Sequence, residues 1–109
     1  MNNSGTRNVY EKDLTSLKEF SAEKPLKKDI LKSDKFNVVL VFLEKNQEIK
    51  PHPEPYAVFF LVLDGAGLFT TEDRSLEIGK GGCIFIQANK IRGIKANERL
   101  TILGVQDGH

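Results

Sequence analysis

The 109-residue sequence has little of what several protein classes require. It contains one cysteine, Cys83, no tryptophan and two histidines. A single cysteine excludes an internal disulfide, and because no signal sequence is recognisable we expect the protein in the cytoplasm. The longest apolar runs, residues 38–43 and 57–63, fall far short of the roughly 18–20 residues that span a bilayer, so no membrane association is expected.

An excess of charge of either sign is missing as well. The 16 Lys and Arg residues are balanced by 15 Asp and Glu residues, which leaves a net charge of +1. The lysine-rich stretch 24–35 has acidic residues interleaved with it, and this pattern is typical of a solvated face. We therefore expect no nucleic-acid partner.

What the sequence does contain is a series of short segments rich in Val, Ile, Leu and Phe, separated by turn residues. This pattern indicates an all-β sandwich or barrel. The expected strands are 36–44, 56–63, 67–71, 76–78, 83–87, 91–95 and 100–105. Before them, Asp13 is a candidate N-cap for one helical turn, and Pro25 argues against any helix beyond it. We expect a single domain, with residues 1–35 as an irregular or short helical segment packed on a barrel of residues 36–109.

Two motifs lie in this β-rich part. The first runs from Asn46 through His52 to Gly65, and the second from Gly81 through Asn89 to residue 92. Their spacing resembles that of the cupin family, whose motifs read Gly-x5-His-x-His-x3/4-Glu-x6-Gly and Gly-x5-Pro-x-Gly-x2-His. The two asparagines replace family glycines, and asparagine tolerates a left-handed turn better than other non-glycine residues. The resemblance implies a small double-stranded β-helix, or jelly-roll barrel.

The metal ligands of the family pattern are mostly replaced. Glu54 stands where the first motif has its second His, Val58 where it has Glu, and Arg92 where the second motif has its His. Val58 has no donor atom, and Arg92 carries a fixed charge and no lone pair. We therefore expect no metal and no other cofactor. If Zn, Fe, Mn or Ni were bound, His52 and Glu54 would be the ligands.

The first motif also predicts a binding face. Alternate residues of a strand share one side, and by the resemblance this side points into the barrel. The prolines of residues 51–55 donate no ladder hydrogen bonds, which places the stretch at a rim or edge. We expect a small-molecule ligand in the barrel mouth. Its expected contacts are His52, Glu54, Tyr56, Arg92, Val58 and Phe60, with further apolar wall from Phe42, Val62 and Ile86.

This interpretation makes the protein a binding module, such as a sensor or accessory protein. The alternative is a metal-dependent cupin enzyme of the dioxygenase, isomerase or decarboxylase type with an altered ligand set. A third hypothesis is an interaction module whose outer faces matter more than its interior. No nucleophile elbow is present, and Cys83 with His52 is a nucleophile–base pair only in principle. No catalytic residue is assigned.

Arg92 has two possible placements. In the family pattern its position converges with that of Glu54, which predicts an ion pair between the two side chains. The alternative is an arginine turned to solvent, with its stem lying over neighbouring apolar residues.

The expected strands 36–43 and 56–63 are apolar on both faces. A lone antiparallel sheet needs only one apolar face, so something has to cover the second. We expect a homodimer in which the partner covers Val39, Val41, Phe59, Leu61 or their neighbours. The alternative cover is the N-terminal segment through Leu31.

Overall fold

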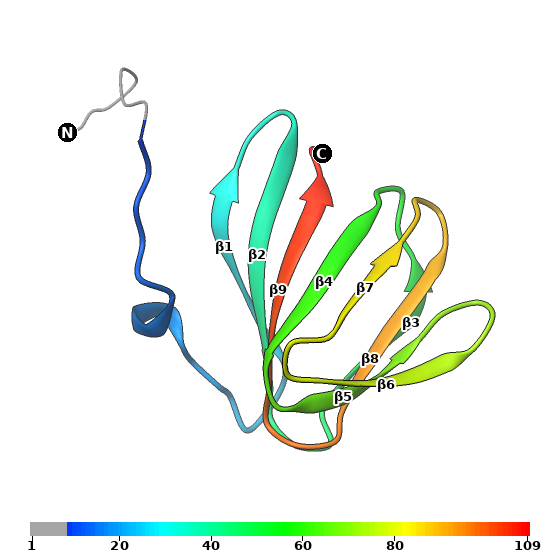
Figure 1. The fold of residues 1–109 in the computed structure, drawn as a ribbon. Coiled ribbons are helices and arrows are strands. Elements are labelled where there is room, and N and C mark those ends of the chain that lie inside the picture. Colours follow the sequence, from blue (N-terminus) through cyan, green and yellow to red (C-terminus); the bar gives the residue numbers. More distant parts are fainter. Residues whose placement is uncertain (1–8) are drawn as a thin grey trace.

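In the computed structural model, residues 9–109 are described, and they form an all-β domain of two facing antiparallel sheets (Figure 1). The first sheet has the strand order β1-β2-β9-β4-β7 and the second β3-β8-β5-β6. The strands are β1 Leu26–Lys32, β2 Phe36–Leu43, β3 Glu48–Pro53, β4 Val58–Asp64, β5 Ala66–Thr70, β6 Ser75–Gly79, β7 Cys83–Ile86, β8 Ile91–Ala96 and β9 Leu100–Asp107. The predicted jelly-roll class is confirmed, with the sheets arranged as a sandwich.

Two of these strands were not predicted, and both lie at sheet edges. β1 carries three lysines and an aspartate, and β3 contains two prolines. An edge strand leaves one side unpaired, so it accommodates charged side chains and residues without an N–H. The edge position expected for the first motif is thereby confirmed. The predicted helical turn is a 3₁₀ helix, η1 Leu14–Leu17, in which Asp13 accepts from the Thr15 backbone N–H at 3.0 Å. Residues 1–8 of the expected N-terminal segment lie outside the described residues.

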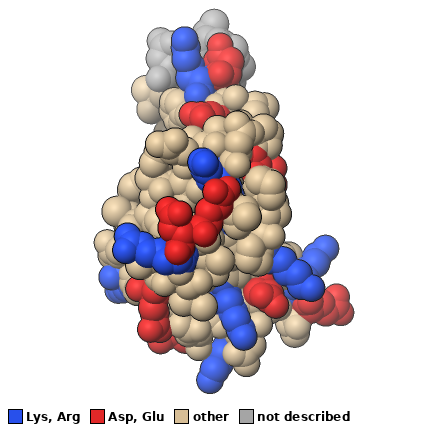
Figure 2. Space-filling model, turned by 90° about the vertical axis from the view of Figure 1, so that its right-hand side faces the viewer, with Lys and Arg blue, Asp and Glu red and all other residues tan. Residues whose placement is uncertain are grey.

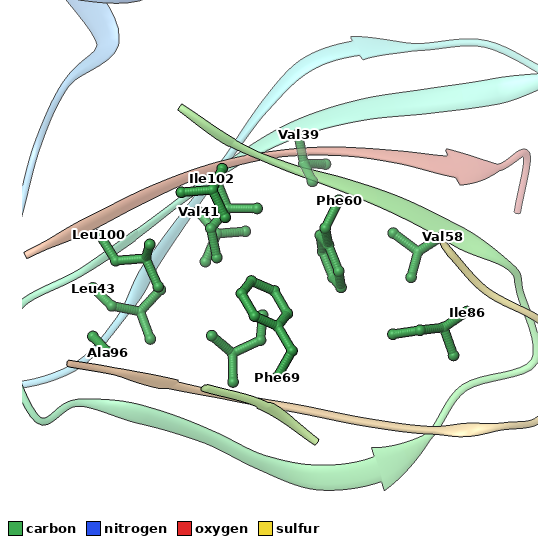
Figure 3. Close-up of a cluster of buried hydrophobic side chains, with 12 residues drawn as sticks. Val39, Val41, Leu43, Val58, Phe60, Phe69, Ile86, Ala96, Leu100 and Ile102 are labelled. Atoms are coloured by element: carbon green, nitrogen blue, oxygen red, sulfur yellow. The ribbon is translucent and has the colours of Figure 1, made fainter. Parts of the chain in front are cut away.

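The core lies between the two sheets, which are close together at one end and diverge toward the other (Figure 1). At the close end Leu43, Ala96 and Leu100 are completely buried. Figure 3 shows Phe60 and Phe69 reaching toward each other from opposite sheets, with ring centroids 5.9 Å apart. Apolar contact between the two sheets therefore forms the core and closes the end where they are close together.

Four turns have the left-handed backbone that the motifs predict. Positive φ angles occur at Gly65 (82°) and Gly81 (88°), and also at Asn46 (74°) and Asn89 (67°). A Cβ atom on Gly65 would lie 1.9 Å from the backbone oxygen of Arg99, so only glycine fits there. The two asparagines therefore adopt the conformation of the glycines they replace, as predicted.

The N-terminal segment covers part of the outer face of the five-stranded sheet. Leu40 and Phe42 face outward, yet both are buried. The ring of Phe20 meets Phe42 edge-on at 5.3 Å, and the Arg99 guanidinium lies 4.4 Å from the Phe20 centroid. The expectation that Phe42 lines the barrel interior is therefore wrong. The alternative cover, a segment of the same chain, accounts for this half of the face.

The expectation that a partner subunit covers Val39 and Val41 on the other face of β2 is also wrong. Val39 and Val41 lie in the core, because the register with β9 sets them opposite Gly104 and Ile102. On the outer face, Phe59 of β4 and Phe85 of β7 are cross-strand neighbours and stay 37% and 59% exposed. A homodimer that covers this exposed part stays a prediction.

The charged surface is mixed. On the face shown in Figure 2, acidic and basic side chains alternate with uncharged ones, and neither sign dominates. Within residues 9–109, no helix has the length and apolar character needed to cross a membrane.

Candidate functional site

A cavity of about 220 Å³ opens between the first sheet and strands β3 and β8. We call it the β1–β3 cavity. Its apolar wall consists of Val39, Val41, Ile49, Phe60 and Ile94. Its polar wall consists of Lys27, His52, Glu54, Tyr56, Arg92 and Gln106. Residues far apart in the sequence, from β1 to β9, therefore converge on one small space.

Five of the six predicted contact residues lie on this wall, and Val58 does not. Val58 is buried in the core opposite Ile86 of β7, away from the cavity lining. Val58 shares the inward face of β4 with Phe60, as the expected alternation predicts, but core packing encloses it and only Phe60 reaches the cavity. Val62 and Ile86, expected as further wall, also belong to the core.

Sequence reasoning missed Lys27, Gln106 and the valines of β2. Lys27 lies on β1, the unpredicted edge strand. Gln106 follows the inward phase of β9, which it shares with Leu100 and Ile102, and it is a buried polar residue. A polar residue in the buried phase of an apolar strand could have pointed to Gln106. It was missed because the strand was expected to end at residue 105.

The two motifs meet across β3 and β8. The register sets His52 directly opposite Arg92, and the backbone N–H of Asn89 donates to the Glu54 carbonyl at 2.7 Å. Gly93 makes the close approach possible, since a Cβ there would lie 2.7–2.9 Å from Pro51. The convergence that the family pattern implies is therefore present, although the residues differ.

His52 and Glu54 form a pair at the cavity mouth. His52 Nε2 lies 2.8 Å from a Glu54 carboxylate oxygen, and Nδ1 lies 2.7 Å from the Lys50 carbonyl. An imidazolium can donate to both oxygens, whereas a neutral ring can donate to only one. Both side chains are partly exposed, so the pair is in contact with water.

Arg92 follows neither expected arrangement. It is only 5% exposed, and within residues 9–109 no ion pair joins it to Glu54. Its Nη2 donates to the carbonyls of Gln87 (3.0 Å) and Lys90 (3.2 Å), and its Nε donates to the Lys90 carbonyl at 3.2 Å. Nη1 is buried and has no hydrogen-bond partner among residues 9–109. The carbonyls of the turn before β8 hold the guanidinium, while Glu54 is bound to His52.

Tyr56 lies between Arg92 and His109. The Arg92 guanidinium is 5.3 Å from the Tyr56 ring centroid, and the His109 ring stacks on Tyr56 at 4.0 Å with an interplanar angle of 6°. Burial raises the pKa of Tyr56, the charge of Glu54 adds to this, and the charge of Arg92 opposes it. Its hydroxyl therefore stays protonated at neutral pH and can act as a donor.

The side chains at the motif's metal positions do not fit a metal. His52 and Glu54 already bond to each other, Val58 lies in the core, and Arg92 presents a cation. Within the described part of the chain, no three His, Cys, Asp or Glu side chains cluster in a way that could hold an ion. Cys83 is exposed on β7 and is not part of the cavity wall, so it does not pair with His52.

A second and larger hollow lies at the other edge of the sandwich. This β6–β7 cleft has a volume of about 430 Å³. Leu76 of β6 and Ile84 of β7 contribute to its lining, together with the 71–74 turn and Lys90. Unlike the β1–β3 cavity, it contains none of the six predicted contact residues, although Ile86, expected as further apolar wall, lines it.

Comparison with solved structures supports the fold. A protein from Thermus thermophilus has a TM-score of 0.85 at 20% identity, covering 92% of this chain and 98% of the other. A cupin superfamily protein from Desulfitobacterium hafniense has a TM-score of 0.81 at 19% identity, covering 94% and 97%. A conserved protein of unknown function from Streptococcus pyogenes has a TM-score of 0.79 at 20% identity, covering 97% and 93%. At such identities the likeness shows the fold alone.

Comparison with family profiles goes further. No curated protein matches the sequence significantly. The profile of the Cupin domain family matches residues 39–104, which is more than half of the chain and includes both motifs. With both motifs meeting across β3 and β8, the chain belongs to the cupin family.

Proposed function

We propose that this cupin domain binds a small organic molecule in the β1–β3 cavity and acts as a sensor or accessory protein. The observation that supports this most directly is the convergence of His52, Glu54, Tyr56 and Arg92 on a cavity whose other side is an apolar wall of five residues. A few convergent polar groups in an apolar pocket fix the orientation of a ligand. Drug-sized ligands occupy roughly 300–1,000 Å³, so a smaller molecule is expected here.

The alternative is a metal-dependent cupin enzyme with an altered ligand set. Such a site needs at least three protein donors, and the cavity wall offers the imidazole of His52 and the carboxylate of Glu54. Both groups are engaged with each other at 2.8 Å. The geometry therefore favours binding over metal chemistry.

The test is to fill the cavity without touching its polar groups. Ile49 and Ile84 are both partly buried and packed against the core, but Ile49 lines the β1–β3 cavity and Ile84 the β6–β7 cleft. Ile49→Phe should abolish binding of fragments that raise the melting temperature of the wild type. Ile84→Phe is the matched control and should leave binding unchanged. Fragments that bind Ile49→Phe as well as the wild type would refute the proposal.

A further inference from the structure

Arg92 lines the β1–β3 cavity, and its guanidinium is only partly hydrogen-bonded. Three hydrogen bonds to backbone carbonyls hold Nε and Nη2, and this fixes the plane of the guanidinium. Nη1 carries two protons, is buried, and has no partner among residues 9–109. Buried polar groups are almost always hydrogen-bonded, so this exception requires an explanation. A ligand acceptor in the cavity would supply the missing partner.

The charges around the cavity indicate what kind of acceptor fits. Lys27 and Arg92 contribute two positive charges, and Glu54 contributes one negative charge. Glu54 is bound to His52 at the mouth, and no ion pair within residues 9–109 joins it to either cation. Within residues 9–109, the buried Arg92 guanidinium therefore has no carboxylate partner, and the carboxylate of a ligand would supply one.

We propose that the cavity's ligand is a small organic acid with one carboxylate, which accepts a hydrogen bond from Nη1 of Arg92. This inference rests on the function proposed above and specifies the chemical class of the ligand. The protonated Tyr56 hydroxyl is a second donor on the same wall. A carboxylate brings a negative charge and a planar pair of oxygens to the guanidinium, which favours it over an amide or alcohol.

The rest of the ligand should be apolar and compact. The apolar wall consists of Val39, Val41, Ile49, Phe60 and Ile94, none of which can bind a second charged group. A phosphate ester fits less well, because its second negative charge would meet the Glu54 carboxylate on the same wall. The volume of about 220 Å³ further limits the ligand to a small body.

The experiment compares an acid with a neutral molecule of similar shape. Benzoate and benzyl alcohol form one pair, 3-methylbutanoate and 3-methylbutanol a second, and phenyl phosphate serves as a dianion. Binding to the full chain is followed by NMR titration, including the side-chain signal of Arg92. The acids should bind about tenfold or more tightly than the alcohols, and only the acids should shift the Arg92 signal.

Two arginine variants test whether the preference for acids comes from the cavity or from positive charge elsewhere on the protein. Arg92→Met should remove the preference for acids, with about a tenfold loss for benzoate and no change for benzyl alcohol. Arg74→Met, in the β6–β7 cleft, is the matched control and should keep the preference. If Arg92→Met does not fold, the Arg92 signal of the wild type provides the same information.

The outcomes distinguish this inference from the proposed function. If alcohols bind as tightly as acids and Ile49→Phe blocks both, the cavity binds ligands but the carboxylate inference is wrong. Tighter binding of phenyl phosphate than of benzoate would also overturn it. If none of the acids or alcohols binds, the inference is overturned and the proposed function loses its support.

Discussion

The two hollows of the sandwich differ in how completely their charged groups are exposed or hydrogen-bonded. In the β6–β7 cleft, Glu72 lies 3.8 Å from Lys90 and accepts from the Ile91 backbone N–H at 3.4 Å, and both side chains are well exposed. In the β1–β3 cavity, which is half as large, the Arg92 guanidinium is buried and one nitrogen has no partner among residues 9–109. The charged groups of the cleft are exposed and close to each other, whereas the buried guanidinium of the cavity is only partly hydrogen-bonded.

Volume is therefore a poor guide to the functional site of this protein. A wide cleft between two edge strands forms wherever two sheets diverge, and exposed ions at its rim cost little free energy. A charged group removed from water is different, because leaving its donors unpaired costs free energy of folding. Such a cost is expected to persist where a ligand offsets it. The smaller hollow is therefore the better candidate for the functional site, and three measurements of stability test the contrast.

The largest effect on stability is expected at Phe69, a core residue that lines neither hollow. Phe69 is completely buried between the sheets. Phe69→Ala should lower the free energy of unfolding by about 3–5 kcal/mol, because it removes a packed ring and leaves a cavity. Phe85→Ala on the exposed outer face is the control and should cost less than about 1 kcal/mol. Urea unfolding measures both, and equal losses would contradict the placement of the core.

A smaller effect of opposite sign is expected at the β1–β3 cavity. Arg92→Met replaces a buried, partly unsatisfied cation by an apolar chain of similar length. The unfolding free energy should rise by about 1 kcal/mol, because the desolvated charge is removed and the turn carbonyls can bind water. Lys90→Met in the β6–β7 cleft removes an exposed ion pair and should change it by less than about 0.5 kcal/mol. A clear loss of stability in Arg92→Met would show that the arginine serves the fold.

The smallest effect is expected at alkaline pH and involves Tyr56. Burial, together with the charge of Glu54, raises its pKa above the ordinary value of 10.0. The folded protein therefore holds the phenol proton after the unfolded chain has lost it, so stability falls as the pH rises through and above 10.0. Tyr56→Phe should remove this part of the decline. Melting temperatures from about pH 8 to 11 test it, and identical slopes for both proteins would contradict the prediction.

Much of the fold was predictable from local patterns. Turn residues and apolar runs located seven strands, and the positive φ angles at Asn46 and Asn89 follow from the motif spacing. The two edge strands were missed because lysines and prolines suit an edge and give no apolar signal. The phase of β2 was not predictable either. Both of its faces are apolar, and only pairing with β9 decides that Val39 faces inward.

Most residues of the candidate site were predictable from the sequence, but their hydrogen-bond partners were not. Motif spacing brought His52, Glu54, Tyr56 and Arg92 to one wall. The partners of Arg92 are backbone carbonyls of a turn, which no side-chain pattern reveals. Val58 faces inward as predicted, but it is enclosed by the core, and strand alternation alone does not separate a core position from a cavity position.

The position of β9 has a consequence for how the protein folds during synthesis. This strand follows all the others in the sequence, yet it lies between β2 and β4 near the middle of the first sheet. During synthesis, the β1–β2 hairpin and β4 have no shared neighbour until residues 100–107 have left the ribosome. Pairings between segments this distant form slowly, because a long loop must close before the contacts form. The cavity, which Gln106 helps to line, can therefore exist only after the final strand is in place.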